Sequence, residues 1–309
     1  MSLETDLLLD RRHLKRRLTF WRVCAVLAVL AVALVALGRG GIERGRPHVA
    51  RLVVDGVITD DSALVRQLDA LTEDPATKAL IVAIDSPGGS VAGGQSLHDA
   101  LERVAAKMPV VAVMGGTAAS AGYMIALPAA RIFARSSTIT GSIGVLLPTG
   151  EVSGLLGKLG ITTDAITSGP LKDQPSGTRP LSPEGRAVLQ GLVMDMYDQF
   201  VAMVAAGRHM SEAQVRSLAD GRVYTGRQAL ALKLVDALGE ERDARAWLEA
   251  TRQIPASLPV EPVRRAGWQA RMLDRASGSL AGLVLKTVWG QGVTVDGAWA
   301  IWQPETQGQ

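Results

Sequence analysis

Histidine and cysteine are scarce in this sequence of 309 residues, and their scarcity removes several kinds of chemistry. The single cysteine, Cys24, lies inside an apolar run, which excludes an intrachain disulfide and a cysteine-based metal cluster. None of the four histidines stands in a metal-ligand spacing such as H-E-x-x-H. His13 precedes the apolar run and His48 follows it, which leaves only His98 or His209 for a serine–histidine–aspartate triad. We therefore expect no metal and no cofactor.

The charge pattern argues against nucleic acid as a partner. The formal net charge is only +3, and aromatic residues make up 4% of the chain. The arginines are spread along the sequence without aromatic residues between them, whereas a nucleic-acid site gathers basic side chains on one face. Hydrophobic residues make up 47% of the chain, which is enough apolar material for the core of one large globular domain.

An apolar run near the N-terminus predicts a membrane anchor. Residues 23–38 carry no charge, and Phe20 and Trp21 add an aromatic edge of the kind found at membrane interfaces. The basic cluster at 11–17 outweighs the positive charge after the run, so the positive-inside rule puts the N-terminus in the cytoplasm and the rest outside. A cleaved signal peptide is the alternative, but no clear A-x-A site ends the run. We expect an uncleaved transmembrane helix at 20–38.

Apolar strands alternate with helices in the next part of the chain. Strands are expected at 49–58, 79–85 and 110–114. A helix is expected at 63–71, and another follows a glycine-rich loop at 86–94. Continuous apolar strands separated by helices are typical of an α/β fold with largely parallel pairing.

From Ser182 onward the pattern becomes helical. Ser182 followed by Pro183 predicts a helix start, and an apolar stripe at helical spacing comes after it. We interpret this stripe as core or subunit contact rather than as a ligand site. The stripe comprises Leu189, Val193, Met196, Phe200 and Val204, and capping boxes are expected at Ser211–Gln214 and Thr225–Gln228. The predicted organisation is a basic cytoplasmic N-terminus (1–19), the anchor (20–38), a linker (39–47), a globular domain (48–250) and a C-terminal tail (251–309).

One serine surrounded by small residues is a candidate nucleophile. Ser120 lies where an apolar strand gives way to a helix, and its small neighbours let a substrate backbone come close. A helix N-terminus adds a positive field and a free N–H group, both of which stabilise an oxyanion. The alternative is a serine that caps the helix or packs closely. Gly88 and Gly89 also allow two interpretations. Their backbone N–H groups could hold an oxyanion, or the two glycines could simply form the turn between a strand and a helix.

A serine hydroxyl becomes a nucleophile only when a base takes its proton, and with histidine scarce lysine is the next candidate. A lysine acts as a base only when burial or nearby positive charge keeps it neutral. Lys172 is distinctive because it lies in a turn-rich segment, 168–173, directly after an apolar strand. Composition alone also allows Lys172 to be an ordinary surface residue.

Taken together, these segments resemble the signal peptide peptidase A family in its single-length bacterial form. The matching segments occur in the family's order; they are DSPGG (85–89), AASAGY (118–123), TGSIGV (140–145), SGPLKD (168–173) and GRVYTG (221–226) leading to LVD (234–236). The resemblance implies a ClpP/crotonase-like β-α superhelix with a serine–lysine dyad. It implies Ser120 as nucleophile, Lys172 as general base, and Ser142 as the residue that orients the lysine. Gly88 or Gly89, together with the Ala121 N–H group, would form the oxyanion hole.

The same resemblance implies a setting and a substrate. Family members form homo-oligomers in which neighbouring subunits complete each active site, and they cut remnant signal peptides and other hydrophobic or unfolded segments. The chain would then be anchored in the bacterial inner membrane with its catalytic domain on the periplasmic side. Two other interpretations remain open: a crotonase-type acyl-CoA enzyme and a non-catalytic membrane scaffold. The tail at 251–309 lies outside the match and could pack on a neighbour, touch the membrane or fray.

Overall fold

The computed structural model describes residues 20–21 and 45–263. The strands are β1 (His48–Ile58), β2 (Thr77–Gly89), β3 (Val110–Ala119), β4 (Arg131–Ala134), β5 (Ile139–Gly141), β6 (Val223–Thr225), β7 (Ala237–Leu238) and β8 (Val260–Pro262). The helices are α2 (Ser62–Leu71), α3 (Val91–Ala105), α4 (Ala121–Met124), α5 (Ser153–Lys158), α6 (Pro183–Arg208), α7 (Glu212–Leu218), α8 (Gly226–Ala231) and α9 (Glu241–Arg252).

All of these strands belong to one sheet, and nearly all of its pairings are parallel. The main order is β6-β5-β3-β2-β1-β8, and β4 pairs with both β3 and β7. Only β5 and β6 run antiparallel. Because β2, β3 and β5 are parallel, their carboxyl ends meet at one edge of the sheet, where α/β folds form their binding sites.

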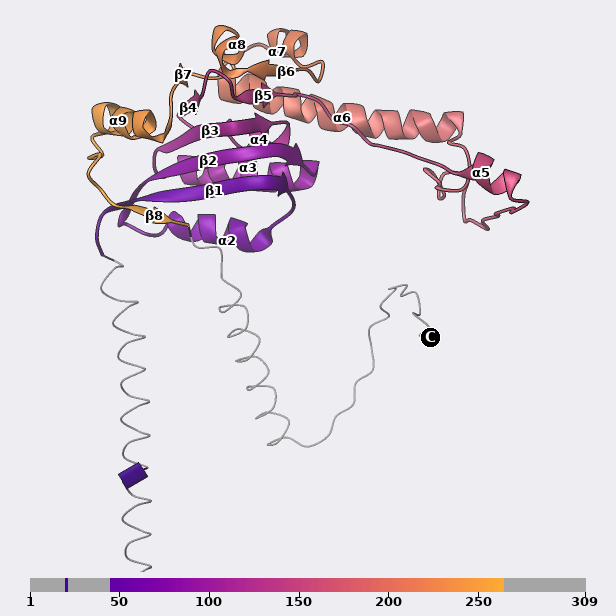
Figure 1. The fold of residues 1–309 in the computed structure, drawn as a ribbon, viewed down its shortest axis with the longest axis horizontal. Helices are drawn as coiled ribbons and strands as arrows, with labels where there is room; N and C mark the ends of the chain where they lie inside the picture. The colour runs from indigo at the N-terminus through magenta and orange to yellow at the C-terminus, as the bar shows by residue number, and fades with distance from the viewer. Residues whose placement is uncertain (1–19, 22–44, 264–309) are drawn as a thin grey trace, which may run out of the picture. The chain divides into compact units, whose positions relative to one another are not determined.

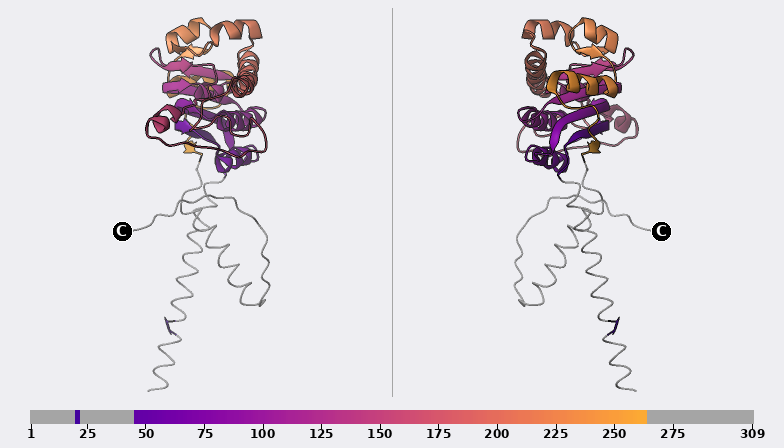
Figure 2. Two further views of the ribbon diagram at one scale, coloured as in Figure 1. Left: turned by 90° about the vertical axis from the view of Figure 1, so that its right-hand side faces the viewer. Right: turned by 90° about the vertical axis from the view of Figure 1, so that its left-hand side faces the viewer.

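The two faces of the sheet bury alternate residues of the same strands. On one face, Leu52 of β1 and Val82 of β2 belong to the main core with residues of α2 and α3. On the other face, Val49 and Ile81 pack with Leu248 of α9. Figure 2 shows α2 and α3 together on one side of the strands. This alternation explains why the central strands read as continuous apolar runs: parallel strands covered on both faces need apolar residues at every position.

One long helix reaches beyond the sheet. Helix α6 begins at Pro183, directly after Ser182, whose side chain caps the helix. Phe200 and Val204, near its end, are buried in the main core. Its beginning lies away from the strands, next to α5 (Figure 1). We call residues 146–182, which include α5, the arm.

Several expectations from the sequence are confirmed by this architecture. The fold is α/β with largely parallel pairing, α6 starts at the expected N-cap, and both capping boxes form. The expected loop at 86–94 is much shorter, since β2 continues to Gly89 and α3 begins at Val91. Strand β8 belongs to the segment that we assigned to the tail, and it pairs with β1.

The predicted anchor at 20–38 lies outside the described residues, except for Phe20 and Trp21, as do the residues of the tail after Val263. Within the ranges that the structure describes, no helix combines the length and the hydropathy needed to cross a membrane.

Candidate active site

Ser120 stands at a sharp turn between β3 and α4. Its φ of 55° and ψ of −122° are unusual for a residue other than glycine, and such strain is commonly stored at functional sites. Its N–H group donates to the Gly141 carbonyl at 2.9 Å, and its carbonyl accepts the N–H groups of Tyr123 and Met124 at 2.9 Å. The backbone on both sides of Ser120 is therefore fixed by the strand next to it and by the helix that follows.

The residue that holds Ser120 is itself tightly enclosed. Gly141 has φ of 80°, and a Cβ added there would lie 2.7 Å from the ring of Tyr224. The Tyr224 hydroxyl donates to the Leu218 carbonyl at 2.9 Å, which fixes the ring. Desolvation by burial raises the pKa of Tyr224, so the phenol stays protonated and keeps this hydrogen bond at neutral pH. The Tyr224 ring thus leaves no room for a side chain at residue 141, whose carbonyl accepts the Ser120 N–H group.

Ser142, the predicted lysine-orienting residue, also has a left-handed backbone, with φ of 51°. Its N–H group donates to the Arg222 carbonyl at 2.9 Å, so the loop after α7 supports it. Ser142 and Ser120 line the same cavity. The structure therefore brings together two of the predicted side chains at the carboxyl ends of β3 and β5.

The two glycines of the predicted oxyanion loop differ in their surroundings. A Cβ at Gly88 would lie 2.8 Å from Cβ of Ser120, so this glycine packs against the turn at Ser120. Its N–H group is taken, because it donates to Oγ of Ser86 at 3.1 Å. Gly89 lines the cavity together with Ser120. Of the two, Gly89 is better located to face a substrate, with Ala121 as the residue directly after Ser120.

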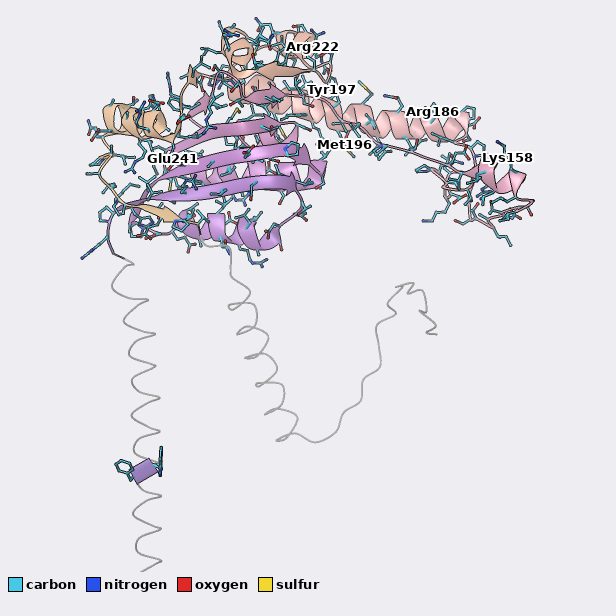
Figure 3. The ribbon with its side chains drawn as sticks, in the orientation of Figure 1. Lys158, Arg186, Met196, Tyr197, Arg222 and Glu241 are labelled. Carbon is cyan, nitrogen blue, oxygen red and sulfur yellow. The ribbon has the colours of Figure 1, made fainter. Side chains whose placement is uncertain are left out.

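The cavity beside Ser120 has a volume of about 750 Å³ and is open to solvent. Its walls are largely apolar; they include Val91, Val145, Leu146 and, from α6, Val193, Met194 and Tyr197. Figure 3 shows Tyr197 on the part of α6 that lies near the strands. A cleft of this size and character suits an extended peptide segment with apolar side chains.

One carboxylate stands in the wall of this cavity. The single Nε–H group of Arg222 is shared between the two carboxylate oxygens of Asp220, at 2.8 Å from each, and Nη2 of the same guanidinium donates to Oδ2. These bonds lower the pKa of Asp220 to about 2, so the carboxylate is ionised and paired at neutral pH. It is thus poorly suited to act as a general base.

Lys172 does not line the cavity of its own copy. It is an exposed residue in a turn of the arm, and its N–H group donates to the Gly169 carbonyl at 3.1 Å. The segment that joins α5 to α6 lies at the end of α6 that points away from the strands (Figure 1). Within the described part of the chain, the residues that line the cavity include no lysine and no histidine. A single copy of these residues therefore brings Ser120 and Ser142 together without placing Lys172 beside them.

The two histidines available for a triad lie elsewhere. His98 is buried on α3, where Nδ1 lies 3.2 Å from Oδ1 of Asp99, and His209 ends α6 with φ of 53°. Neither residue lines the cavity. The arrangement gives no support to a serine–histidine–aspartate triad.

Sequence reasoning missed the part of α6 that forms the cavity wall. We expected the apolar stripe to be core or subunit contact, and Phe200 and Val204 are indeed buried core residues. Val193 of that stripe lines the cavity instead, together with Met194 and Tyr197. Met194 and Tyr197 are large residues outside the stripe. Their presence in the sequence could have indicated a second apolar face on the helix.

Comparison with known proteins adds a family assignment to this geometry. The profile of Peptidase family S49 matches residues 102–255. "Putative protease slr0021" of Synechocystis is 45% identical over 204 residues, which cover 65% of this chain and 73% of that protein. "Putative signal peptide peptidase SppA" of Enterococcus faecium is 36% identical over 236 residues, which cover 71% of this chain and 69% of that protein.

A solved structure also aligns with this chain. A point mutant of ClpP1 from Listeria monocytogenes aligns with a TM-score of 0.43 and 20% sequence identity, covering 62% of this chain and 92% of the mutant. This likeness is too small to support an argument about the fold.

Proposed function

Because the chain belongs to peptidase family S49, and to its signal peptide peptidase A type, we propose that it is a serine endopeptidase with Ser120 as nucleophile and Lys172 as general base. The observation that carries this proposal is the position of Ser120: a strained turn at a helix start, beside an apolar cavity, at the carboxyl edge of the sheet. That combination suits a rigidly held nucleophile that a substrate can reach from the cavity.

The base would come from a second copy of the chain. Lys172 is exposed in the arm, and the cavity of its own copy is lined by no lysine among the described residues. The arm and the nearby part of α6 carry many exposed large apolar side chains, of which Ile166 is fully exposed. The others are Leu146, Leu147, Val152, Leu155, Leu159, Ile161, Leu171, Val188, Leu192 and Met194. Apolar surface on this scale is typical of a protein–protein interface, so docking of the arm on a neighbour would bury it and bring a lysine to the cavity.

The proposed reaction needs neither a metal nor a cofactor. A lysine enclosed between two copies loses its hydration, which favours the neutral amine. This amine takes the proton of Ser120 while Oγ attacks the peptide carbonyl, and Ser142 orients it. The N–H groups of Gly89 and Ala121 stabilise the oxyanion, and the amine then gives its proton to the leaving group. Water, activated by the same amine, hydrolyses the acyl-enzyme.

We also propose the wider setting that the sequence suggests. The apolar run at 23–38 and the basic cluster before it support an anchor at 20–38 in the bacterial inner membrane, with the domain from residue 48 on the periplasmic side. The apolar cavity supports remnant signal peptides and other hydrophobic or unfolded segments as substrates. The proposed fold family is the ClpP/crotonase-like superhelix, and the proposed assembly is a homo-oligomer.

Labelling with a serine-directed fluorophosphonate tests this function. We expect the full-length protein to react at Ser120, and Ser120→Ala to abolish the label because the nucleophile is gone. Lys172→Ala should slow labelling by at least about a hundredfold, since a serine without a base is a poor nucleophile. Intact-mass measurement followed by peptide mapping identifies the labelled residue.

The same experiment separates the rival functions. A crotonase-type acyl-CoA enzyme has no activated serine, and a scaffold needs none, so both would leave Ser120 unlabelled. Labelling at another serine, or unchanged labelling in Lys172→Ala, would contradict the proposed dyad.

A further inference from the structure

A second serine, Ser86, lies close to the nucleophile but faces the interior. It is fully buried in β2, with 0% of its surface exposed. Its Oγ donates to the Gly56 carbonyl at 2.6 Å and accepts the Gly88 N–H group at 3.1 Å. This buried hydroxyl acts as donor in one hydrogen bond and as acceptor in the other, so its position is well defined.

This hydroxyl lies where the sheet ladders are interrupted. The pairing of β1 with β2 shifts register between Asp55 and Val57, so Gly56 has no ladder partner there. The pairing of β2 with β3 shifts between Ile84 and Ser86. At an interrupted ladder, backbone groups need other partners. The Ser86 hydroxyl supplies them, since it ties the Gly56 carbonyl of one strand to the Gly88 amide of the other.

The same hydroxyl acts on the catalytic side through Gly88. Gly88 has φ of 112°, and a Cβ there would lie 2.8 Å from Cβ of Ser120 and 3.2 Å from N of Ala121. Its N–H group donates to Oγ of Ser86, which fixes the peptide plane between Pro87 and Gly88. The same Oγ lies 3.3 Å from the Gly88 carbonyl oxygen, which shares a peptide plane with the Gly89 N–H group. The next residue, Gly89, lines the cavity. The Ser86 hydroxyl thus contacts both peptide groups of Gly88, and the second of them carries the Gly89 N–H group.

The backbone of Ser86 also supports the start of α4. A Cβ at Gly122 would lie 2.8 Å from the Ser86 carbonyl oxygen, so the helix that follows Ser120 packs directly on this residue. Ser86 therefore touches both elements that would supply oxyanion donors: the glycine loop and the N-terminus of α4.

We propose that Ser86 is a positioning residue: its hydroxyl holds the oxyanion loop, Gly88 and Gly89, in place beside Ser120 without touching the substrate. This rests on the proposed function of Ser120 as nucleophile. Removing one oxyanion donor typically lowers kcat by about 10²–10³, and a misplaced donor keeps part of its effect. We therefore expect Ser86→Ala to lower kcat for peptide cleavage by roughly ten- to a hundredfold, with KM changed less than about threefold.

Binding of a transition-state mimic gives a direct measurement. A leucine-rich tripeptide aldehyde adds reversibly to Ser120 Oγ and places an oxyanion in the hole, whereas the matching tripeptide alcohol only occupies the cavity. In Ser86→Ala, the affinity for the aldehyde should fall by the same factor as kcat, and the affinity for the alcohol should stay unchanged. If Ser86→Ala does not fold, Ser86→Cys fills the same space with a weak hydrogen-bonding group and should show the same split.

The same strand provides the control. Thr77, at the other end of β2, is also buried, and its hydroxyl bonds His48 at 3.0 Å and Asp74 at 2.9 Å. Thr77→Val removes a comparable buried hydroxyl far from the cavity, so it should lower thermal stability while leaving kcat and the aldehyde-to-alcohol ratio unchanged. Labelling of the unmodified protein at Ser120 reports on the proposed function alone. Equal kcat and equal aldehyde affinity in Ser86→Ala and the unmodified protein would overturn the role of Ser86 and leave that function standing.

Discussion

The surroundings of Ser120 and the arm that carries Lys172 are built in opposite ways. Around Ser120, glycines are enclosed: a Cβ at Gly88, Gly122 or Gly141 would meet another atom within 2.8 Å. In the arm the space is empty, with nothing within 4 Å of such a Cβ at Gly150, Gly154, Gly157, Gly160, Gly169 or Gly177. The turn at Ser120 is thus closely packed within one copy, whereas the glycines of the arm have no such neighbours. The difference indicates that the arm is shaped to meet another surface.

The largest effect should appear when two inactive variants are mixed. Ser120→Ala and Lys172→Ala should each lose peptide cleavage by at least about 10³-fold, because each removes an essential group. If the dyad forms between copies, random co-assembly pairs an intact serine with an intact lysine at about one site in four. Unfolding and refolding the variants together should therefore restore roughly a quarter of the activity. No recovery in demonstrably mixed oligomers would show that both groups must come from one copy.

A charge on the arm should have a smaller effect. Leu155 lies on α5 and is 59% exposed, and Leu155→Asp puts a carboxylate where an apolar contact is expected. We expect weaker assembly and roughly a tenfold loss of activity at low protein concentration, recovered in part as the concentration rises. Sedimentation velocity measures the assembly. Leu230→Asp, on the surface of α8, is the matched control, and an equal effect of the two variants would argue against a special role for the arm.

Two glycine variants compare the rigidity of the regions. Gly141→Ala combines a positive φ with a Cβ 2.7 Å from Tyr224, and should cost roughly 2–5 kcal/mol of unfolding free energy and slow the labelling of Ser120. Gly160→Ala has a similar φ of 70° but open space, and should cost only about 1–2 kcal/mol. Denaturant unfolding measures both. Equal costs would mean that the enclosure by Tyr224 contributes nothing to the stability of the site.

Local features of the fold were predictable from the sequence. The apolar strands, the helix start at Ser182 and the capping boxes at Ser211 and Thr225 follow from neighbouring residues alone. Strand β8 was not predictable, because it is short, contains Pro262 and forms only by pairing with β1, from which it is separated by most of the chain.

The residues of the candidate site could be named from the sequence, but their arrangement in space could not. Small neighbours and a helix start indicate Ser120, and the family motifs supply Ser142 and the glycine loop. The enclosure of Gly141 by Tyr224 joins residues distant in sequence, and no local pattern announces it. The position of Lys172 on the arm, away from the cavity of its own copy, depends likewise on the path of the chain between α5 and α6.

Helix α6 has a consequence for regulation. One continuous helix carries part of the cavity wall, at Val193 and Met194, and at its beginning adjoins the arm. If the arm completes a neighbour's dyad, a substrate that binds the assembled form more tightly must favour assembly by the same factor. Specific activity would then rise with protein concentration and with substrate. Dilution would act as a built-in safeguard, since a solitary copy could hold a peptide without cutting it.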